Sequence, residues 1–338
     1  MKWLTTTFLF IFLSASITAC TQSSAWKGKL TYGFSGSDIK QYDLATKTDK
    51  LLFKKAKDPF VTAGNEVLFI NEGFPKRNVL VRKSNSTATQ FKDVLDMSSD
   101  NEEYKEQLAN YSVINGTGIS AILDHLSDPR VSPDGKYVSV TVFGYRGQAF
   151  EKNCVAVFDM ATKKLFKKFE DMYYASWLPD GRLLTAGSHK TVSTDGNEYQ
   201  SKNPGIFIVD LQSGNAKRID PELNDPAPYH PAASPDGKRV AFILNDHVWV
   251  MGIDGKNLKQ LTDADNDNVE TFPAWSPDGK FVASWCYKTF EKSYYTAIAI
   301  VSSTAAKPVV LSDKAPVWPR DKKNLRISGG SLQLNWRK

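Results

Sequence analysis

Short apolar segments alternate with polar turns along most of the chain, and one turn sequence recurs. Ser-Pro-Asp-Gly-Lys begins at Ser132, Ser234 and Ser276, and the related Leu-Pro-Asp-Gly-Arg begins at Leu178. Pro presets φ at the second turn position, Asp accepts hydrogen bonds from nearby amides, and Gly takes the positive φ. Because each copy separates two apolar segments, the pattern predicts β-hairpins, in which the Asp is a turn residue and not a catalyst.

Each repeat continues with two further predicted strands. The third ends in an Asp followed by small or polar residues, at Asp43, Asp159, Asp210 and Asp254, and a fourth segment closes the unit. The spacing of the turns suits four short strands plus loops, whereas solenoid repeats are shorter and helical. Four antiparallel strands per repeat predict an all-β fold, a β-propeller of four-stranded blades.

The two ends of the chain predict how the ring closes. Predicted strands at 29–34, 38–44 and 50–53 lack an inner neighbour, and 315–318 supplies a lone strand near the C-terminus. Pairing that strand with the first three gives six blades and joins both ends of the chain. Residues 324–336 then form a surplus hairpin, so a seven-bladed ring is the alternative.

One stretch departs from the β pattern. Within residues 100–111, Tyr104, Leu108 and Tyr111 fall on one helical face, which predicts a small helical insertion on the rim of the propeller. A polar loop is the alternative interpretation of the same residues.

The strand and turn Trp-Ser-Pro-Asp-Gly-Lys at Trp275, together with the hairpin Asp-Leu-x-Thr/Ser motif, resembles the TolB-like, WD-repeat-like propellers. The resemblance covers essentially all of the chain after the signal peptide that we predict at residues 1–19. It implies the fold but not an activity, because enzymes, binding proteins and scaffolds all use this architecture. Unlike TolB itself, the chain has only a few residues between Cys20 and the first predicted strand, with no α/β domain there.

The N-terminus has its own pattern. An uncharged apolar run at 3–17 follows Lys2, which is typical of a signal peptide and is too short to span a bilayer. The run ends in Ile-Thr-Ala-Cys at Cys20, which resembles the bacterial lipobox and predicts a lipid on that thiol. An ordinary secretory signal is the alternative.

We therefore divide the chain into a lipoprotein signal peptide at 1–19, a short tether at 20–25 and a single propeller domain at 26–338. Thr21 stands where an Asp would favour retention in the inner membrane. The sequence thus predicts a lipoprotein anchored in the outer membrane and facing the periplasm, if the organism is Gram-negative.

Composition adds few constraints. The chain is 41% hydrophobic and 24% charged, which is ordinary for a globular protein. Its formal net charge of +6 is spread over strands and turns, so we predict no nucleic-acid partner. Cys154 and Cys286 fall in repeats far apart in the ring, and we expect buried strand cysteines without a disulfide.

The sequence contains no Gly-x-Ser-x-Gly, His-Glu-x-x-His, Cys-x-x-Cys or phosphate-binding glycine loop. Function is therefore expected on the propeller face that carries the long loops, where Tyr and Arg side chains could contact a partner. The main hypothesis is non-enzymatic binding of an envelope protein or glycan without a cofactor. The candidate binding residues are Tyr145, Arg146, His189, Tyr199, Tyr229, His230, Tyr287 and Tyr294.

Two other kinds of chemistry were weighed. Residues 263–268 place oxygens at alternate positions like a Ca²⁺ loop, but no Gly stands sixth and Ala274 stands where the bidentate Glu is needed. We therefore predict no metal site. The alternative function is a polysaccharide lyase or hydrolase with its site in the central funnel, built from histidines of separate blades, namely His125, His189, His230 and His247.

Overall fold

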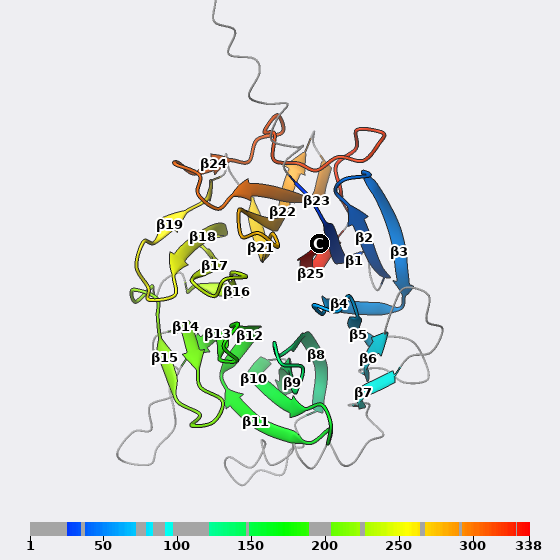
Figure 1. The fold of residues 1–338 in the computed structure, drawn as a ribbon. Helices are drawn as coiled ribbons and strands as arrows, with labels where there is room; N and C mark the ends of the chain where they lie inside the picture. The colour runs from blue at the N-terminus through cyan, green and yellow to red at the C-terminus, as the bar shows by residue number, and fades with distance from the viewer. Residues whose placement is uncertain are drawn as a thin grey trace, which may run out of the picture.

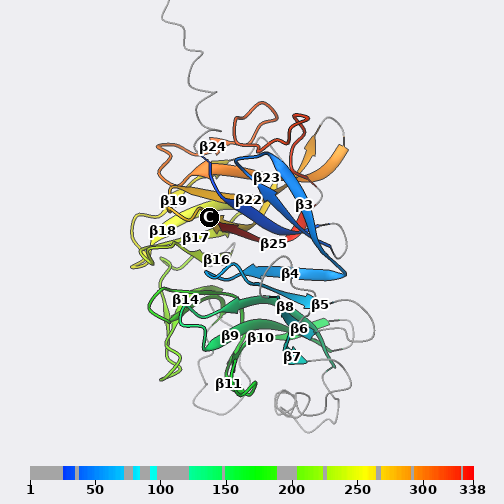
Figure 2. The ribbon, with the colours of Figure 1, turned by 45° about the vertical axis from the view of Figure 1, so that its right-hand side comes forward.

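The computed structural model describes residues 26–34, 38–71, 79–83, 92–96, 122–146, 149–188, 204–223, 227–263, 268–290, 293–328 and 330–338. These residues form strands arranged as sheets around a central axis (Figures 1 and 2), and no helix occurs in these ranges. Accordingly, no helix in the described part of the chain is long and apolar enough to cross a membrane. The helical insertion predicted at 100–111 lies outside the described residues.

Five sheets have four antiparallel strands each. Blade 1 consists of β25 (Gly330–Arg337), β1 (Lys29–Phe34), β2 (Asp38–Asp43) and β3 (Thr48–Lys54). Blade 2 consists of β4 (Ala56–Val61), β5 (Val67–Asn71), β6 (Val79–Lys83) and β7 (Lys92–Asp96). Blade 3 consists of β8 (Ile122–Val131), β9 (Tyr137–Arg146), β10 (Ala149–Asp159) and β11 (Leu165–Glu170).

Blade 4 consists of β12 (Met172–Trp177), β13 (Leu183–Ser188), β14 (Pro204–Val209) and β15 (Ala216–Arg218). Blade 5 consists of β16 (Tyr229–Ala233), β17 (Arg239–Leu244), β18 (His247–Gly252) and β19 (Lys259–Gln260). The ring is completed by a three-stranded sheet of β21 (Val269–Trp275), β22 (Phe281–Phe290) and β23 (Ser293–Ser302). The prediction of six four-stranded blades is therefore wrong, because five sheets have that form.

The missing fourth strand has a local explanation. The segment that should pair with β23 instead forms β24 (Val309–Val310), which pairs in parallel with β20 (Thr262–Asp263). The outer edge of β23 is occupied by later residues, since Ile300 N donates to Val317 O at 2.8 Å and Ile298 N donates to Ile327 O at 3.2 Å. Irregular chain thus satisfies the backbone groups that a regular strand would have paired.

Ring closure follows the predicted principle but uses a different segment. β25 pairs with β1, with Trp336 opposite Leu30 and Leu334 opposite Tyr32, so the ends of the chain share one sheet. The segment at 315–318 is not the inner strand that we predicted, because Val317 and Trp318 are buried against the outer part of the three-stranded sheet. The residues at 330–336, expected to be surplus, form the closing strand.

Three of the recurring turns are held by the same hydrogen bonds. In blade 5, Ser234 Oγ donates to Asp236 Oδ1 at 2.6 Å and accepts from Arg239 N at 2.9 Å. Ser132 and Ser276 make the equivalent bonds. The turn Asp residues are therefore structural, as predicted.

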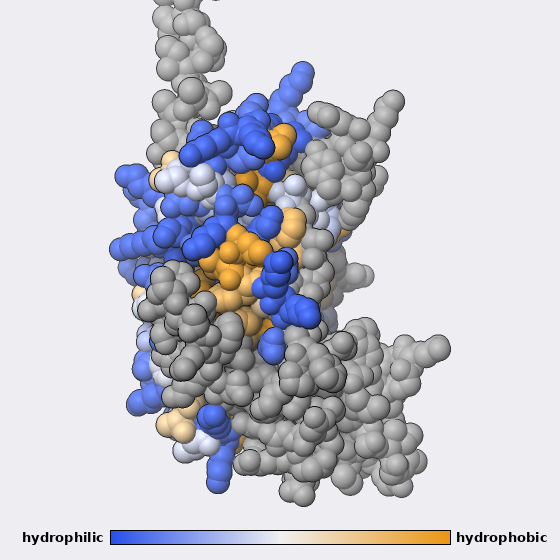
Figure 3. Space-filling view, turned by 90° about the vertical axis from the view of Figure 1, so that its right-hand side faces the viewer, coloured by the Kyte–Doolittle hydropathy of each residue, from blue (hydrophilic) through white to orange (hydrophobic). Residues whose placement is uncertain are grey.

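Apolar side chains are packed between neighbouring sheets, which is where the cores lie. Cys154 and Cys286 are buried in different sheets and no disulfide joins them, which confirms the prediction. Seen from the side, the surface has an apolar area that is bordered by hydrophilic residues (Figure 3). Leu51 of β3 is one of the larger apolar residues that are exposed to solvent.

Candidate functional site

The inner strands of five sheets share a bulge at equivalent positions. The register of strand pairing shifts there, and a non-glycine residue has a positive φ between 49° and 54°, at Asp58, Asp128, Tyr174, His230 and Phe272. An L-residue in this conformation costs on the order of 1 kcal/mol. Such strain persists only where packing imposes it, and it concentrates at functional sites.

The inner strands surround a cavity of about 930 Å³ in the middle of the ring. Residues from all six sheets line it, and its rim is formed by the turns that follow the inner strands, including Pro133, Pro179, Pro235 and Pro277. The mouth of the cavity therefore lies at the turns that follow the inner strands, whereas the predicted binding face carries the loops that join second to third strands and one blade to the next.

Three aromatic rings form the inner end of this cavity. His230 stacks on Phe272 with ring centroids 4.0 Å apart and meets Tyr174 edge-on at 4.0 Å. Its Nδ1 accepts from Phe272 N at 3.3 Å, whereas its buried Nε2 has no hydrogen-bond partner among the described residues. Burial lowers the pKa of His230 to about 3, with the Arg130 charge adding to the effect. His230 is therefore neutral at physiological pH.

A polar wall faces the aromatic rings. Arg130 of β8 forms an ion pair with Asp128, with Nη2 2.7 Å from Oδ1. Its guanidinium also donates to Gln333 Oε1 and, at 3.4 Å, to Asn335 Oδ1 of β25. These contacts join blade 3 to the closing strand of blade 1 across the channel.

Two carboxyl groups lie beside Arg130. Burial raises the pKa of Asp128 to about 6, while Arg130 opposes the shift and Asp58 adds to it. Burial also raises the pKa of Asp58, against a hydrogen bond from Ser127. Buried carboxyl groups with shifted pKa values are concentrated at functional sites.

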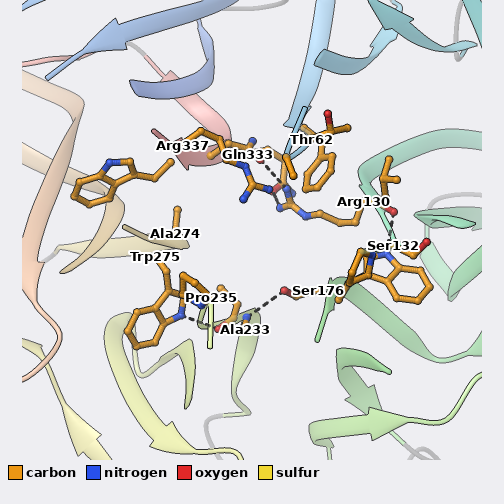
Figure 4. A pocket seen from close by; sticks show the side chains of 18 of the residues that line it. Thr62, Arg130, Ser132, Ser176, Ala233, Pro235, Ala274, Trp275, Gln333 and Arg337 are labelled. Carbon is orange, nitrogen blue, oxygen red and sulfur yellow. Dashed lines mark hydrogen bonds between the residues drawn. The ribbon is translucent and has the colours of Figure 1, made fainter. Parts of the chain in front are cut away.

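Arg337 of β25 brings a second guanidinium to the cavity. Its Nε donates to Val61 O at 2.8 Å, and both Arg337 and Arg130 lie over the Phe60 ring, 5.6 and 5.4 Å from its centroid. The two side chains extend towards each other on one side of the cavity (Figure 4). Burial lowers the pKa of Arg337, and the charge of Arg130 lowers it further.

Three of the eight predicted face residues have described side chains, and these three lie in different surroundings. Among those with described side chains, His230 lies in the channel, Tyr229 OH donates to Asp246 Oδ1 at 3.3 Å, and half-buried Tyr287 packs on a core cluster. Tyr145 and Arg146 belong to β9, and Tyr294 belongs to β23. His189, Tyr199 and the lipidation candidate Cys20 lie outside the described residues. Binding through this face stays a prediction.

Of the other histidines, His247 lies away from the cavity, between blade 5 and the three-stranded sheet. Its Nδ1 is 3.6 Å from Glu270 Oε2, and this buried carboxylate raises the pKa of His247. Glu270 also accepts hydrogen bonds from Thr262 Oγ1 and from Ser284 Oγ at 2.7 Å. The described residues include no group of three or more His, Cys, Asp or Glu that could hold a metal ion.

Sequence reasoning missed the polar wall of Arg130, Gln333, Asn335 and Arg337. One signal was present: four of the five bulge residues precede a proline, in Asp58-Pro59, Asp128-Pro129, His230-Pro231 and Phe272-Pro273. Proline lacks the amide donor that a regular ladder needs, so it is tolerated at bulges. This dipeptide therefore marks the bulge of the inner strand in four of the six sheets.

Fold and cavity together define the class as a β-propeller with a central cavity, similar in fold to TolB. The chain superposes on TolB from Acinetobacter baumannii with a TM-score of 0.55 and 15% identity, covering 91% of this chain and 66% of that one. A protein of Agrobacterium tumefaciens assigned to TolB gives 0.54 and 15% identity, covering 91% and 99%. This similarity concerns the fold. No protein-family model matches the sequence, and no curated protein matches it.

Proposed function

We propose that this protein is a non-enzymatic cell-envelope lipoprotein that binds a segment of an envelope partner at the turn-side mouth of its channel. The observation that carries the proposal is the cavity of about 930 Å³, which residues of all six sheets line. Binding sites are typically concave and largely pre-formed, with a few convergent polar groups.

The chemistry of the lining supports binding. Trp177, Trp275 and the rim prolines supply apolar surface, and Arg130 and Arg337 supply directional donors. Trp and Arg are the residue types that contribute most to binding energy at protein interfaces. Since the two Trp and the two Arg side chains stand on inner strands and not on loops, little conformational entropy is lost when a partner binds.

The anchored location is part of the proposal and rests on the lipobox-like sequence that ends at Cys20. Several acyl chains on one protein give stable membrane attachment, since each buried methylene contributes about 0.8 kcal/mol. Labelling cells with a radioactive fatty acid should mark the wild type but not Cys20→Ser, and fractionation should then place the wild type in the outer membrane.

Ser176 allows a direct test of the cavity. Its side chain lines the cavity, and its Oγ accepts from Ala233 N at 3.1 Å. Ser176→Trp should obstruct the mouth, whereas Ser176→Thr keeps the hydroxyl and serves as the matched control. In crosslinking of intact envelopes, partners captured by the wild type and by Ser176→Thr should be lost in Ser176→Trp. Equal recovery by all three proteins would contradict binding at this mouth.

One observation favours a second candidate, an enzyme acting on polysaccharides. Asp128 lines the cavity, and burial raises its pKa to about 6, which suits a general acid near neutral pH. If the protein is such a lyase or hydrolase, it should cleave envelope or acidic polysaccharides, and Asp128→Asn should abolish the cleavage. Binding without product release would favour the first proposal.

A further inference from the structure

Arg337 places a positive charge at the cavity that no carboxylate balances among the described residues. Arg130, the neighbouring guanidinium, has Asp128 as its partner at 2.7 Å. For Arg337 the hydrogen bond within the described part of the chain is the one from Nε to Val61 O. Its two terminal nitrogens, Nη1 and Nη2, are therefore available to a ligand.

The position of Arg337 is fixed before any ligand arrives. The bond to Val61 O and the Phe60 ring below the guanidinium hold the side chain against blade 2. Asn335, on the same strand, is held in the same way by a bond from its Nδ2 to Pro59 O. A planar guanidinium held by Nε presents two parallel N–H groups, the geometry that binds a carboxylate with two hydrogen bonds.

The electrostatics of the site also favour an anion beside Arg337. Arg130 and Arg337 share the Phe60 ring, so two positive charges lie close together in a half-buried place. Burial lowers the pKa of Arg337, and the charge of Arg130 lowers it further. A bound anion would relieve both the desolvation of Arg337 and its repulsion from Arg130.

We propose that Arg337 binds the carboxylate of an acidic side chain, Asp or Glu, in the partner segment that enters the turn-side mouth. This inference rests on the proposed function and specifies which chemical group the mouth selects. The acidic residue lies beside Arg337 and Arg130, with its neighbours along the segment against the opposite wall.

The opposite wall favours a peptide over an acidic glycan. Ala232 and Ala274 line the cavity there with Trp275 and Pro277. Small apolar residues leave room for the apolar neighbours of an acidic residue, whereas a sugar chain needs polar groups on several sides for its hydroxyls. The guanidinium donors of this cavity lie on one wall, in Arg130 and Arg337, while Ser132 and Ser176 add hydroxyl groups elsewhere in the lining.

The test uses the full chain and short blocked peptides that carry Glu between apolar residues, each with a Gln twin. Titration calorimetry should show Glu peptides binding about tenfold more tightly than their Gln twins, as expected for a charge-assisted pair. Arg337→Gln should abolish this preference, and Arg337→Lys should retain part of it. Lys256→Gln, which removes an exposed charge away from the cavity, should leave the preference unchanged.

A second pair of variants keeps the test valid if Arg337→Gln does not fold. Ala232→Glu supplies an internal carboxylate to the cavity, and Ala232→Gln has the same size without the charge. The Glu variant alone should lose binding of the acidic peptides. Equal binding by these two variants would overturn the assignment, as would a wild type without a preference for Glu over Gln.

Oligogalacturonate, which carries carboxylates on a glycan, is the third probe. If it binds through Arg337 while the Glu peptides do not, the peptide assignment is overturned. The envelope crosslinking separates this inference from the proposed function: partners lost in Ser176→Trp but kept in Arg337→Gln would overturn the carboxylate site alone.

Discussion

The indole Nε1 of Trp275 donates a hydrogen bond of 2.9 Å to the backbone carbonyl of Ala232 in the neighbouring blade. Trp177 makes the same bond to the carbonyl of Arg130. In both cases the Trp ends one inner strand, and the acceptor lies two residues before the turn of the preceding blade. The Trp of the repeated motif therefore joins adjacent blades and braces the lining of the cavity.

Trp275→Phe should lower the free energy of unfolding by about 1–3 kcal/mol, because the carbonyl of Ala232 loses its buried donor. Trp249→Phe is the matched control, since Trp249 Nε1 is buried without a hydrogen-bond partner among the described residues. Denaturant titration should show a clearly larger loss for Trp275→Phe. Equal losses would mean that ring volume and not the hydrogen bond stabilises this contact.

Ser234→Ala should destabilise the protein by roughly 1–2 kcal/mol, since the hydroxyl makes a bond to Asp236 and receives one from Arg239 N. Ser312→Ala is the control, because the contact recorded for Ser312 with Trp318 uses its carbonyl and not its side chain. Thermal unfolding of both variants tests this. If the two melt alike, the turn does not depend on its serine.

Two groups in the channel should give opposite slopes of stability against pH. The folded-state pKa of His230 is about 3, below its unfolded value. The contribution of neutral His230 to the free energy of unfolding is therefore complete above about pH 6.5 and is lost as the pH falls towards 3. The folded-state pKa of Asp128 is about 6, above its unfolded value. The contribution of the protonated Asp128 carboxyl to the free energy of unfolding is therefore present at low pH and is lost as the pH rises through 6.

In the wild type these slopes oppose each other between about pH 4 and pH 6. His230→Asn removes one of them, so the stability of this variant, relative to the wild type, should fall as the pH rises through that range. The stability of Asp128→Asn, relative to the wild type, should rise as the pH rises through the same range. Each full slope amounts to about 1.4 kcal/mol per pH unit. Denaturant midpoints at several pH values measure this, and parallel curves for all three proteins would contradict the assignment.

Gly255 and Gly181 allow a matched test of backbone packing, because both have a similar positive φ, +81° and +86°. A Cβ at Gly181 would meet no atom within 4 Å, whereas one at Gly255 would lie 2.1 Å from the carbonyl oxygen of Ile219. Gly181→Ala should cost about 1–2 kcal/mol for its conformation alone. Gly255→Ala should lower the free energy of unfolding by more than this, because blade 4 must shift to make room for the methyl group. Equal unfolding midpoints for the two variants would contradict this prediction.

Turn chemistry made the blades predictable. Ser234, Asp236 and Gly237 lie close in sequence and form the turn by themselves, so local residue types were sufficient to identify the hairpins. The candidate site was much less predictable. His230 was singled out for a loop-rich face, but the bulge in β16 turns its ring into the channel, where it stacks on Phe272 of another sheet.

The sequence by itself determined the class of fold, because alternating apolar segments and Pro-Asp-Gly turns are local signals that fold in the same way in each repeat. Tertiary structure decided which C-terminal segment closes the ring. The segments at 315–318 and 330–337 both have apolar residues suited to a strand. β25 takes the inner place because Leu334 and Trp336 enter a core while Asn335 and Arg337 bond to the backbone of blade 2. The same contacts bring Arg337 of the closing strand beside Arg130 of blade 3. No local pattern could encode this proximity, because the two residues are far apart in the sequence.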